Sequence, residues 1–173
     1  MRLFIATQFD DEVKDHIQAV QERLRRLDSR ANFTRRENLH LTLAFLGEIP
    51  EERLADIEEA MNAVETAPLE LCFDRMGRFR RRDSELWWIG ARGNRELERM
   101  QAELTARLRS KGFSLEERTF QPHLTLAREV RLTRPPDRAA LLGNPFAAHV
   151  DAMSLMRSQR LQGRLIYTEL FRR

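Results

Sequence analysis

Apolar residues alternate with polar residues in some parts of the chain and recur every three or four positions in others, which predicts a mixture of strands and amphipathic helices. The clearest strand covers residues 39–46, which read LHLTLAFL. Asp10 is expected to cap a helix that continues to about residue 27, because a carboxylate there can accept hydrogen bonds from the free amides of the first turn. Further strands are expected at residues 2–9, 33–34, 69–79, 86–91, 120–127, 150–156 and 165–170, and further helices at residues 51–64, 94–111 and 137–142.

The tetrapeptide HLTL occurs twice, starting at His40 and at His123, which lie 83 positions apart. The same offset aligns the apolar residues 3–5 with residues 86–88, so each half of the chain runs strand, long helix and HLTL strand. Such a repeat predicts two similar units that pack together, because neither unit can bury a sheet face alone.

The expected fold class is therefore α+β, a bilobal domain with approximate internal two-fold symmetry. The two units span about residues 2–82 and 85–170, and residues 1–173 are expected to form one domain, since this length suits a single core. A doubly wound parallel sheet is the alternative. It is disfavoured because the strands follow one another in pairs instead of alternating strictly with helices.

Two polar pairs mark the HLTL strands. Side chains in a strand alternate between the two faces of a sheet, so His40 and Thr42 share one face, as His123 and Thr125 do. The symmetry predicts that both pairs meet in one site. Two imidazoles can serve as general acid and general base, and two hydroxyls can hydrogen-bond phosphoryl oxygens, so this set indicates phosphodiester cleavage by proton transfer. Symmetry leaves open which histidine is the acid.

No metal is expected at this site, because two histidines without carboxylates at ligand spacing make a poor metal site. The charge pattern adds a hint about the partner. The chain has 30 Lys and Arg and 27 Asp and Glu residues, a formal net charge of +3 and an isoelectric point near 9.7. Every basic residue except Lys14 and Lys111 is an arginine, whose planar guanidinium suits phosphate.

A high isoelectric point is typical of proteins that bind nucleic acid, although arginine-rich codon usage would give the same composition. The small net charge argues against a large non-specific surface for duplexes. Other classes are excluded more directly. Cys72 is the single cysteine, so no intrachain disulfide can form. No apolar run approaches the length of a membrane span, and acidic residues 10–12 argue against a signal peptide, so the expected location is cytoplasmic.

The segments ENLHLTLAFLG at residues 37–47 and FQPHLTLAR at residues 120–128 resemble the paired HXTX motifs of the two-histidine (2H) phosphoesterases. The chain most resembles the bacterial and archaeal family of RNA 2′,3′-cyclic phosphodiesterases, formerly called 2′-5′ RNA ligases, over nearly its whole length. The resemblance implies a bilobal, duplicated α+β fold with a water-filled cleft that holds both motifs, and it implies no cofactor.

The resemblance also assigns roles to single residues. It makes His40 the proton donor and His123 the proton acceptor, with Thr42 and Thr125 holding the phosphate and Arg128 binding it. The implied enzyme is a hydrolase of RNA processing, an RNA 2′,3′-cyclic 3′-phosphodiesterase that needs no metal and forms a 2′-phosphomonoester.

The expected partners are RNA ends or small nucleotides that carry a 2′,3′-cyclic phosphate. We expect a monomer with no membrane contact and no obligate protein partner. Activity as a 2′-5′ RNA ligase or 2′-5′ phosphodiesterase at the same site is an alternative. A non-catalytic module that binds RNA phosphate is an alternative of another class, although binding alone would not need two titrating groups.

Three aromatic residues near the motifs are also of interest. Trp87 and Trp88 are consecutive, so in a strand they face opposite ways; one is expected in the core, and the other could line the cleft and stack on a base. Phe45 follows Thr42 by three residues, so regular alternation places it on the opposite face, in the core.

Overall fold

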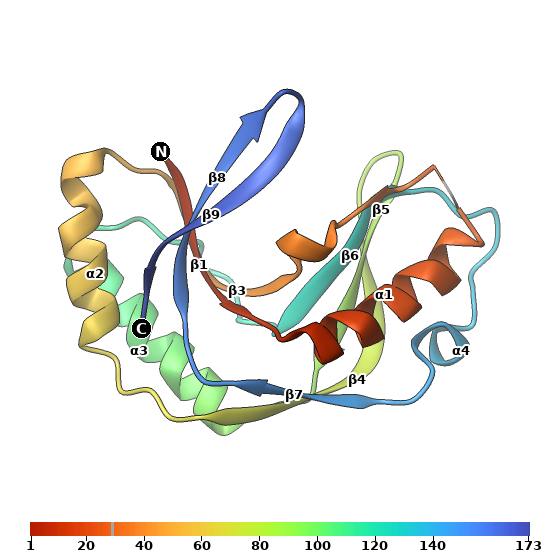
Figure 1. The fold of residues 1–173 in the computed structure, drawn as a ribbon, viewed down its shortest axis with the longest axis horizontal. Coiled ribbons are helices and arrows are strands. Elements are labelled where there is room, and N and C mark those ends of the chain that lie inside the picture. The colour runs from red at the N-terminus through yellow and green to blue at the C-terminus, as the bar shows by residue number, and fades with distance from the viewer. Residues whose placement is uncertain (29) are drawn as a thin grey trace.

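The computed structural model describes residues 1–28 and 30–173 and shows one nine-stranded sheet (Figure 1). Its strands are β1 (Arg2–Gln8), β2 (Asn32–Phe33), β3 (His40–Glu48), β4 (Leu69–Arg80), β5 (Glu85–Ala91), β6 (His123–Val130), β7 (Phe146–Val150), β8 (Ser154–Leu161) and β9 (Arg164–Arg172). They follow the order β7-β4-β5-β6-β3-β1-β8-β9, and β2 pairs with β6. The pairings are antiparallel, so the α+β class is confirmed and the parallel alternative is wrong.

Two of the helices begin where the sequence predicts. Asp10 accepts a hydrogen bond from the amide of Val13 at 2.8 Å, and Asn94 accepts one from the amide of Leu97 at 3.0 Å. The helices are α1 (Asp11–Arg25), α2 (Leu54–Asn62), α3 (Arg95–Ser110) and α4 (Arg138–Leu142), with single 3-10 turns η1 (Arg36–Asn38) and η2 (Glu51–Arg53). None of the helices in the described ranges combines the length and apolar character needed to cross a membrane.

The sheet consists of two lobes that meet where β3 pairs with β6, at the fully buried residues Leu41 and Leu124. We call β3, β1, β8 and β9 the first lobe, and β6, β5, β4 and β7 the second lobe. Helices α2 and α3 lie beside the first lobe, and α1 and α4 beside the second (Figure 1). Since α1 precedes β3 in the chain but contacts β6 and β7, and α3 follows β5 but contacts β3, the lobes exchange their helices.

The registers correct the expected alignment of the first strands of the two units. Thr42 is the Cα partner of Ala6, and Thr125 is the Cα partner of Trp88. Ala6 therefore corresponds to Trp88, an offset of 82, and the expected offset of 83 is wrong by one residue in these strands. A shift of one residue exchanges the two faces of a strand. Trp87 is accordingly the fully buried tryptophan, and Trp88 lies on the face of Thr125.

The end of the chain also differs from expectation. Instead of one strand over residues 150–156, β7 ends at Val150 and β8 begins at Ser154. Strands β8 and β9 then form a long hairpin whose turn contains Gln162 and Gly163, with φ angles of 49° and 76°. Two consecutive positive φ angles are typical of the type I′ turn that matches the twist of a hairpin. This hairpin projects from the first lobe (Figure 1).

Candidate active site

The β3–β6 contact brings the two motifs together. Leu41 and Leu124 are paired and point into the core, so the residues that flank them point to the opposite face. In an antiparallel pair this geometry sets His40 on the side of Thr125 and Thr42 on the side of His123. The four polar side chains expected to share one site therefore project from two neighbouring strands onto one face.

The ring of His40 is held by hydrogen bonds on both nitrogens. Its Nδ1 lies 2.7 Å from the carbonyl oxygen of Asn38, and because a carbonyl can only accept, Nδ1 carries the proton. Its Nε2 lies 3.0 Å from Oγ1 of Thr42. Phe4 packs on the imidazole at 4.9 Å between ring centroids, and Tyr167 meets it edge-on at 5.2 Å. The tautomer and orientation of His40 are therefore fixed, and in the neutral ring Nε2 is the nitrogen without a proton.

His123 is held in a similar way in the second lobe. Its Nδ1 donates to the carbonyl oxygen of Gln121 at 2.7 Å, which leaves Nε2 as the nitrogen available to a reactant. Phe79 meets the imidazole edge-on at 5.3 Å, and Trp88 lies at 5.8 Å. Both histidines thus combine a main-chain acceptor at Nδ1 with an aromatic wall.

Burial keeps both imidazoles neutral at pH 7 before a substrate binds. The pKa of His40 is lowered to about 4, first by burial and then by repulsion from the charge of Arg128 and from His123 when that imidazole is protonated, against a raising hydrogen bond to Asn38. The pKa of His123 is also lowered, first by burial and then by the charge of Arg118. A histidine that acts as an acid here can hold its proton only if the bound substrate raises the pKa of the imidazole.

A β-bulge after Thr42 overturns the expectation for Phe45. The β1 partners of Thr42 and Ala44 are consecutive residues, so Leu43 is an extra residue in β3. Leu43 and Ala44 both point into the core. Phe45 consequently lies on the same face as Thr42, 39% exposed, and its expected place in the core is wrong.

A second β-bulge occurs at the equivalent place in β6. The β5 partners of Thr125 and Ala127 are consecutive, so Leu126 is the extra residue, and Leu126 and Ala127 are both fully buried. The bulge turns Arg128 toward the face of Thr125. Arg128 therefore lines the same cavity as His40, and it occupies in the second lobe the position that Phe45 occupies in the first.

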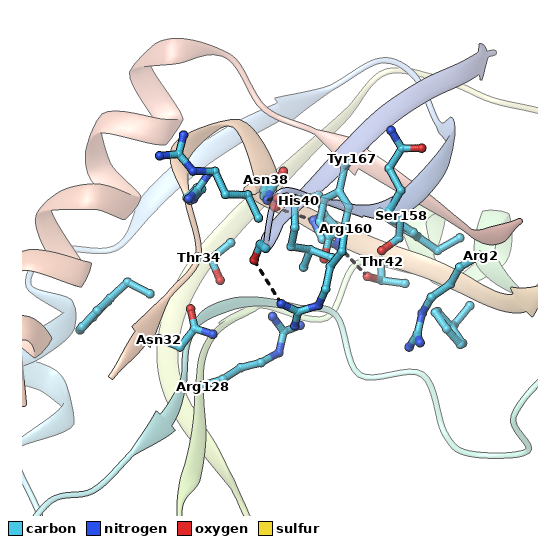
Figure 2. A pocket seen from close by; sticks show the side chains of 18 residues that line it. Arg2, Asn32, Thr34, Asn38, His40, Thr42, Arg128, Ser158, Arg160 and Tyr167 are labelled. Atoms are coloured by element: carbon cyan, nitrogen blue, oxygen red, sulfur yellow. Dashed lines mark hydrogen bonds between the residues drawn. The ribbon is translucent and has the colours of Figure 1, made fainter. Parts of the chain in front are cut away.

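Two hollows flank the β3–β6 contact. A cavity of about 620 Å³ contains His40, Thr42 and Arg128 in its lining (Figure 2), and a smaller one of about 180 Å³ contains His123. Thr42 and Phe45 line both cavities, so the two hollows adjoin. Thr125 lines neither of these two cavities among the described residues, and its place on the shared face follows from the register alone.

Several residues of the larger cavity carried no signal in the sequence. Tyr167, Arg160 and Arg164 come from the β8–β9 hairpin, more than a hundred positions after His40, and Figure 2 shows two of them, Tyr167 and Arg160, beside the motif residues. Arg2 at the start of β1 also lines the cavity. Only the folded sheet reveals that these side chains reach the site.

Trp88 packs against the imidazole of His123, with 5.8 Å between the ring centroids, and it lines neither cavity. A Cβ atom on Gly77 would lie 2.1 Å from Cζ2 of this indole, and one on Gly90 would lie 2.8 Å from its Cζ3. The two glycines therefore leave the space that the ring fills, at 7% exposure. In its packed position Trp88 supports the imidazole of His123 and offers little surface for base stacking.

Comparisons with known proteins extend these observations. The sequence model of the 2′-5′ RNA ligase superfamily matches residues 9–162. The chain is 36% identical over 132 residues to the RNA 2′,3′-cyclic phosphodiesterase of Archaeoglobus fulgidus, covering 76% of this chain and 74% of that protein. A protein of the same name from Methanothermobacter thermautotrophicus is 31% identical over 179 residues, with 98% and 96% coverage.

A solved structure is similar over almost the whole fold. The crystal structure of Escherichia coli LigT complexed with 3′-AMP matches with a TM-score of 0.84 at 25% identity and covers 99% of this chain and 95% of that one. The match of the superfamily model to residues 9–162 includes both HLTL strands. The chain therefore belongs to the 2′-5′ RNA ligase superfamily.

Proposed function

We propose that this protein hydrolyses the terminal 2′,3′-cyclic phosphodiester of RNA to a 2′-phosphomonoester by acid–base catalysis with two histidines. The observation that carries the proposal is the matched pair His40 and His123, each with Nδ1 bound to a carbonyl and each on the same face of the β3–β6 junction. The activity named for the relatives at 36% and 31% identity, and the nucleotide 3′-AMP bound to the E. coli neighbour, support this chemistry.

In the proposed reaction a water molecule attacks the cyclic phosphorus while Nε2 of His123 takes its proton. The bond between phosphorus and the ribose 3′ oxygen breaks, and Nε2 of His40 gives its proton to that oxygen. The assignment of acid and base follows the family resemblance. The anionic substrate makes the assignment workable, because a phosphodiester beside the buried His40 opposes the effect of burial and raises the pKa of this imidazole.

Three other residues would stabilise the charge that develops on the phosphoryl oxygens. The hydroxyls of Thr42 and Thr125 lie on the face of the histidines, and the guanidinium of Arg128 lines the cavity of His40. Donors that are already aimed at the developing charge lower the barrier without reorganisation in the transition state. Within residues 1–28 and 30–173 no group of three or more His, Cys, Asp or Glu residues is arranged to hold a metal ion. The proposed mechanism uses these side chains and a water molecule.

The test is to incubate the protein, in excess EDTA, with an oligoribonucleotide that ends in a 2′,3′-cyclic phosphate and to identify the products. We expect hydrolysis to a 2′-phosphate almost exclusively, by phosphorus NMR or by chromatography against authentic 2′- and 3′-nucleotides. A pure 3′-phosphate would reverse the roles of acid and base. Loss of activity in EDTA with recovery on one divalent metal would overturn the metal-free mechanism, and tight binding without hydrolysis would identify a binding module.

The lowered pKa values also predict the pH dependence. We expect a bell-shaped profile of kcat/KM with its maximum below pH 6.5, since one histidine must be neutral, the other protonated, and both pKa values are lowered from 6.5. The profile of kcat should be displaced to higher pH, because bound phosphate raises the pKa of His40. Steady-state kinetics over about pH 4–9 measure both profiles. Flat profiles would contradict the paired imidazoles, and superimposable ones would contradict the raised pKa of His40 in the substrate complex.

A further inference from the structure

The cavity beside His40 holds more positive charge than one phosphoryl group requires. Its volume is about 620 Å³, and no Asp or Glu residue lines it in the described chain. Five arginines do: Arg2, Arg35, Arg128, Arg160 and Arg164. The proposed reaction uses one of them, Arg128, at the cyclic phosphate. The other four arginines carry positive charge that this phosphate does not use.

Three of these arginines do not stabilise the fold through salt bridges to described residues. Arg2, Arg160 and Arg164 form no salt bridge with any described carboxylate. The guanidinium of Arg2 lies over the ring of Phe45, 5.1 Å from its centroid. The guanidinium of Arg160 donates to the carbonyl of Gly163 at 3.3 Å, which leaves other N–H groups free. Their donors are available to an anionic ligand.

The arginines converge from strands that the fold brings together. Arg164 directly follows the type I′ turn of the β8–β9 hairpin, Arg160 lies two positions before that turn, and Arg2 lies on β1, next to β8. Figure 2 shows Arg2, Arg128 and Arg160 directed into the cavity from three different strands. The hairpin thus places its charges opposite the motif strand that carries His40.

The covalent structure of ribose indicates which part of the RNA would lie at these arginines. In the proposed function, on which this inference rests, the 3′ oxygen lies at His40. The carbon that carries this oxygen is bonded to C4′, and C4′ carries the 5′ carbon and its phosphate. The phosphodiester that joins the last nucleotide to the rest of the RNA therefore leaves the ribose on the His40 side, where the cavity lies.

We propose that Arg2, Arg160 and Arg164 bind the phosphodiester immediately upstream of the terminal cyclic phosphate. The site then takes the 3′ end of an RNA chain, and a lone nucleoside cyclic phosphate leaves these arginines unused. Guanidinium–phosphate hydrogen bonds are charge-assisted and bidentate, so they hold the chain in one direction as well as adding affinity.

The experiment compares kcat/KM for two substrates, a dinucleotide that ends in a 2′,3′-cyclic phosphate and the corresponding nucleoside 2′,3′-cyclic phosphate. The native protein should prefer the dinucleotide. Arg160→Ala and Arg164→Ala should each lower the ratio of the two values roughly tenfold, as expected for one lost hydrogen bond to a charged group. Higher salt should reduce the same ratio, because arginine–phosphate contacts are screened.

Arg157→Ala is the matched control. Arg157 lies on the same strand, is exposed and carries the same charge, but it does not line the cavity. Its replacement should leave the ratio unchanged. Equal ratios in Arg157→Ala and Arg160→Ala, or no preference for the dinucleotide in the native protein, would overturn the proposal.

A binding measurement separates this inference from the proposed function. The native protein and Arg160→Ala are titrated with a dinucleotide that carries a non-cyclic 2′-phosphate and with the matching nucleoside 2′-phosphate. Weaker binding of the dinucleotide alone to Arg160→Ala supports the subsite even if neither cyclic substrate is hydrolysed. Equal weakening for both ligands rejects it even if hydrolysis proceeds as proposed.

Discussion

Replacing either motif histidine by alanine is expected to lower turnover of an RNA 2′,3′-cyclic phosphate by roughly 100-fold or more, since a positioned proton donor or acceptor contributes 10²–10⁴-fold. His40→Ala removes the proposed donor and His123→Ala the proposed acceptor. The double variant should be far less active than native protein but much more active than the product of the two single effects implies, because both groups serve one step. Single-turnover kinetics with the three variants measure this.

The control must separate chemistry from folding. His149 lies exposed on β7, paired with Glu70, and lines neither cavity, so His149→Ala should retain native activity. His40→Asn keeps a polar side chain in the space between Phe4 and Tyr167 and should be as inactive as His40→Ala. Near-native turnover by a well-folded variant at either motif histidine would show that the site is assigned wrongly.

Gly77→Ala is expected to lower the free energy of unfolding by about 1–3 kcal/mol, the usual cost of forcing extra atoms into packed space. The added Cβ would meet the Trp88 indole at 2.1 Å, and Gly77 is the β4 residue directly opposite Trp88 in the sheet. The indole must move, and because it lies 5.8 Å from the ring of His123, turnover should fall as well. Urea unfolding and steady-state kinetics on the same variant measure the two losses.

Gly93→Ala provides the comparison, because its Cβ would meet nothing closer than the Glu98 carboxylate at 3.6 Å. Its stability and activity should remain native. Combining Gly77→Ala with Trp88→Phe should recover part of the lost stability, since the smaller ring vacates the contested space. A Gly77→Ala protein as stable as Gly93→Ala would show that the indole has room to shift without cost.

The sequence was sufficient for the parts of the site that depend on local alternation. His40 and Thr42 share a face because a regular strand alternates, and Asp10 caps α1 because its carboxylate accepts a hydrogen bond from the free amide of Val13. The alternation predicts Phe45 in the core, and this prediction is wrong because a β-bulge inserts one residue whose position nothing in LHLTLAFL marks. The first strands of the two units were misaligned by one residue for a related reason: apolar residues match one another at either register.

Long-range structure was out of reach of the sequence. Tyr167 and Arg160 reach the cavity of His40 because β8 pairs with β1, and the pairing of distant strands leaves no short-range pattern. Burial likewise depends on the whole fold. From the sequence alone a motif histidine has the usual imidazole pKa, whereas burial in the folded chain lowers the pKa of His40 to about 4. The candidate residues of the proposed reaction can thus be named from the sequence, whereas their surroundings cannot.

The exchange of elements between the lobes determines when the protein can fold during its synthesis. The first half of the chain leaves the ribosome with only the β1–β3 pairing available to it, because β4 pairs with β5 and β7, and α1 packs on β6 and β7. The apolar faces of α1 and β4 therefore stay exposed to solvent until the second half of the chain is synthesised. Strand β1 lacks its outer neighbour until β8, near the end of the second half, is made. A gene cut at the middle would therefore encode two fragments, each of which lacks strand and helix partners that the other supplies.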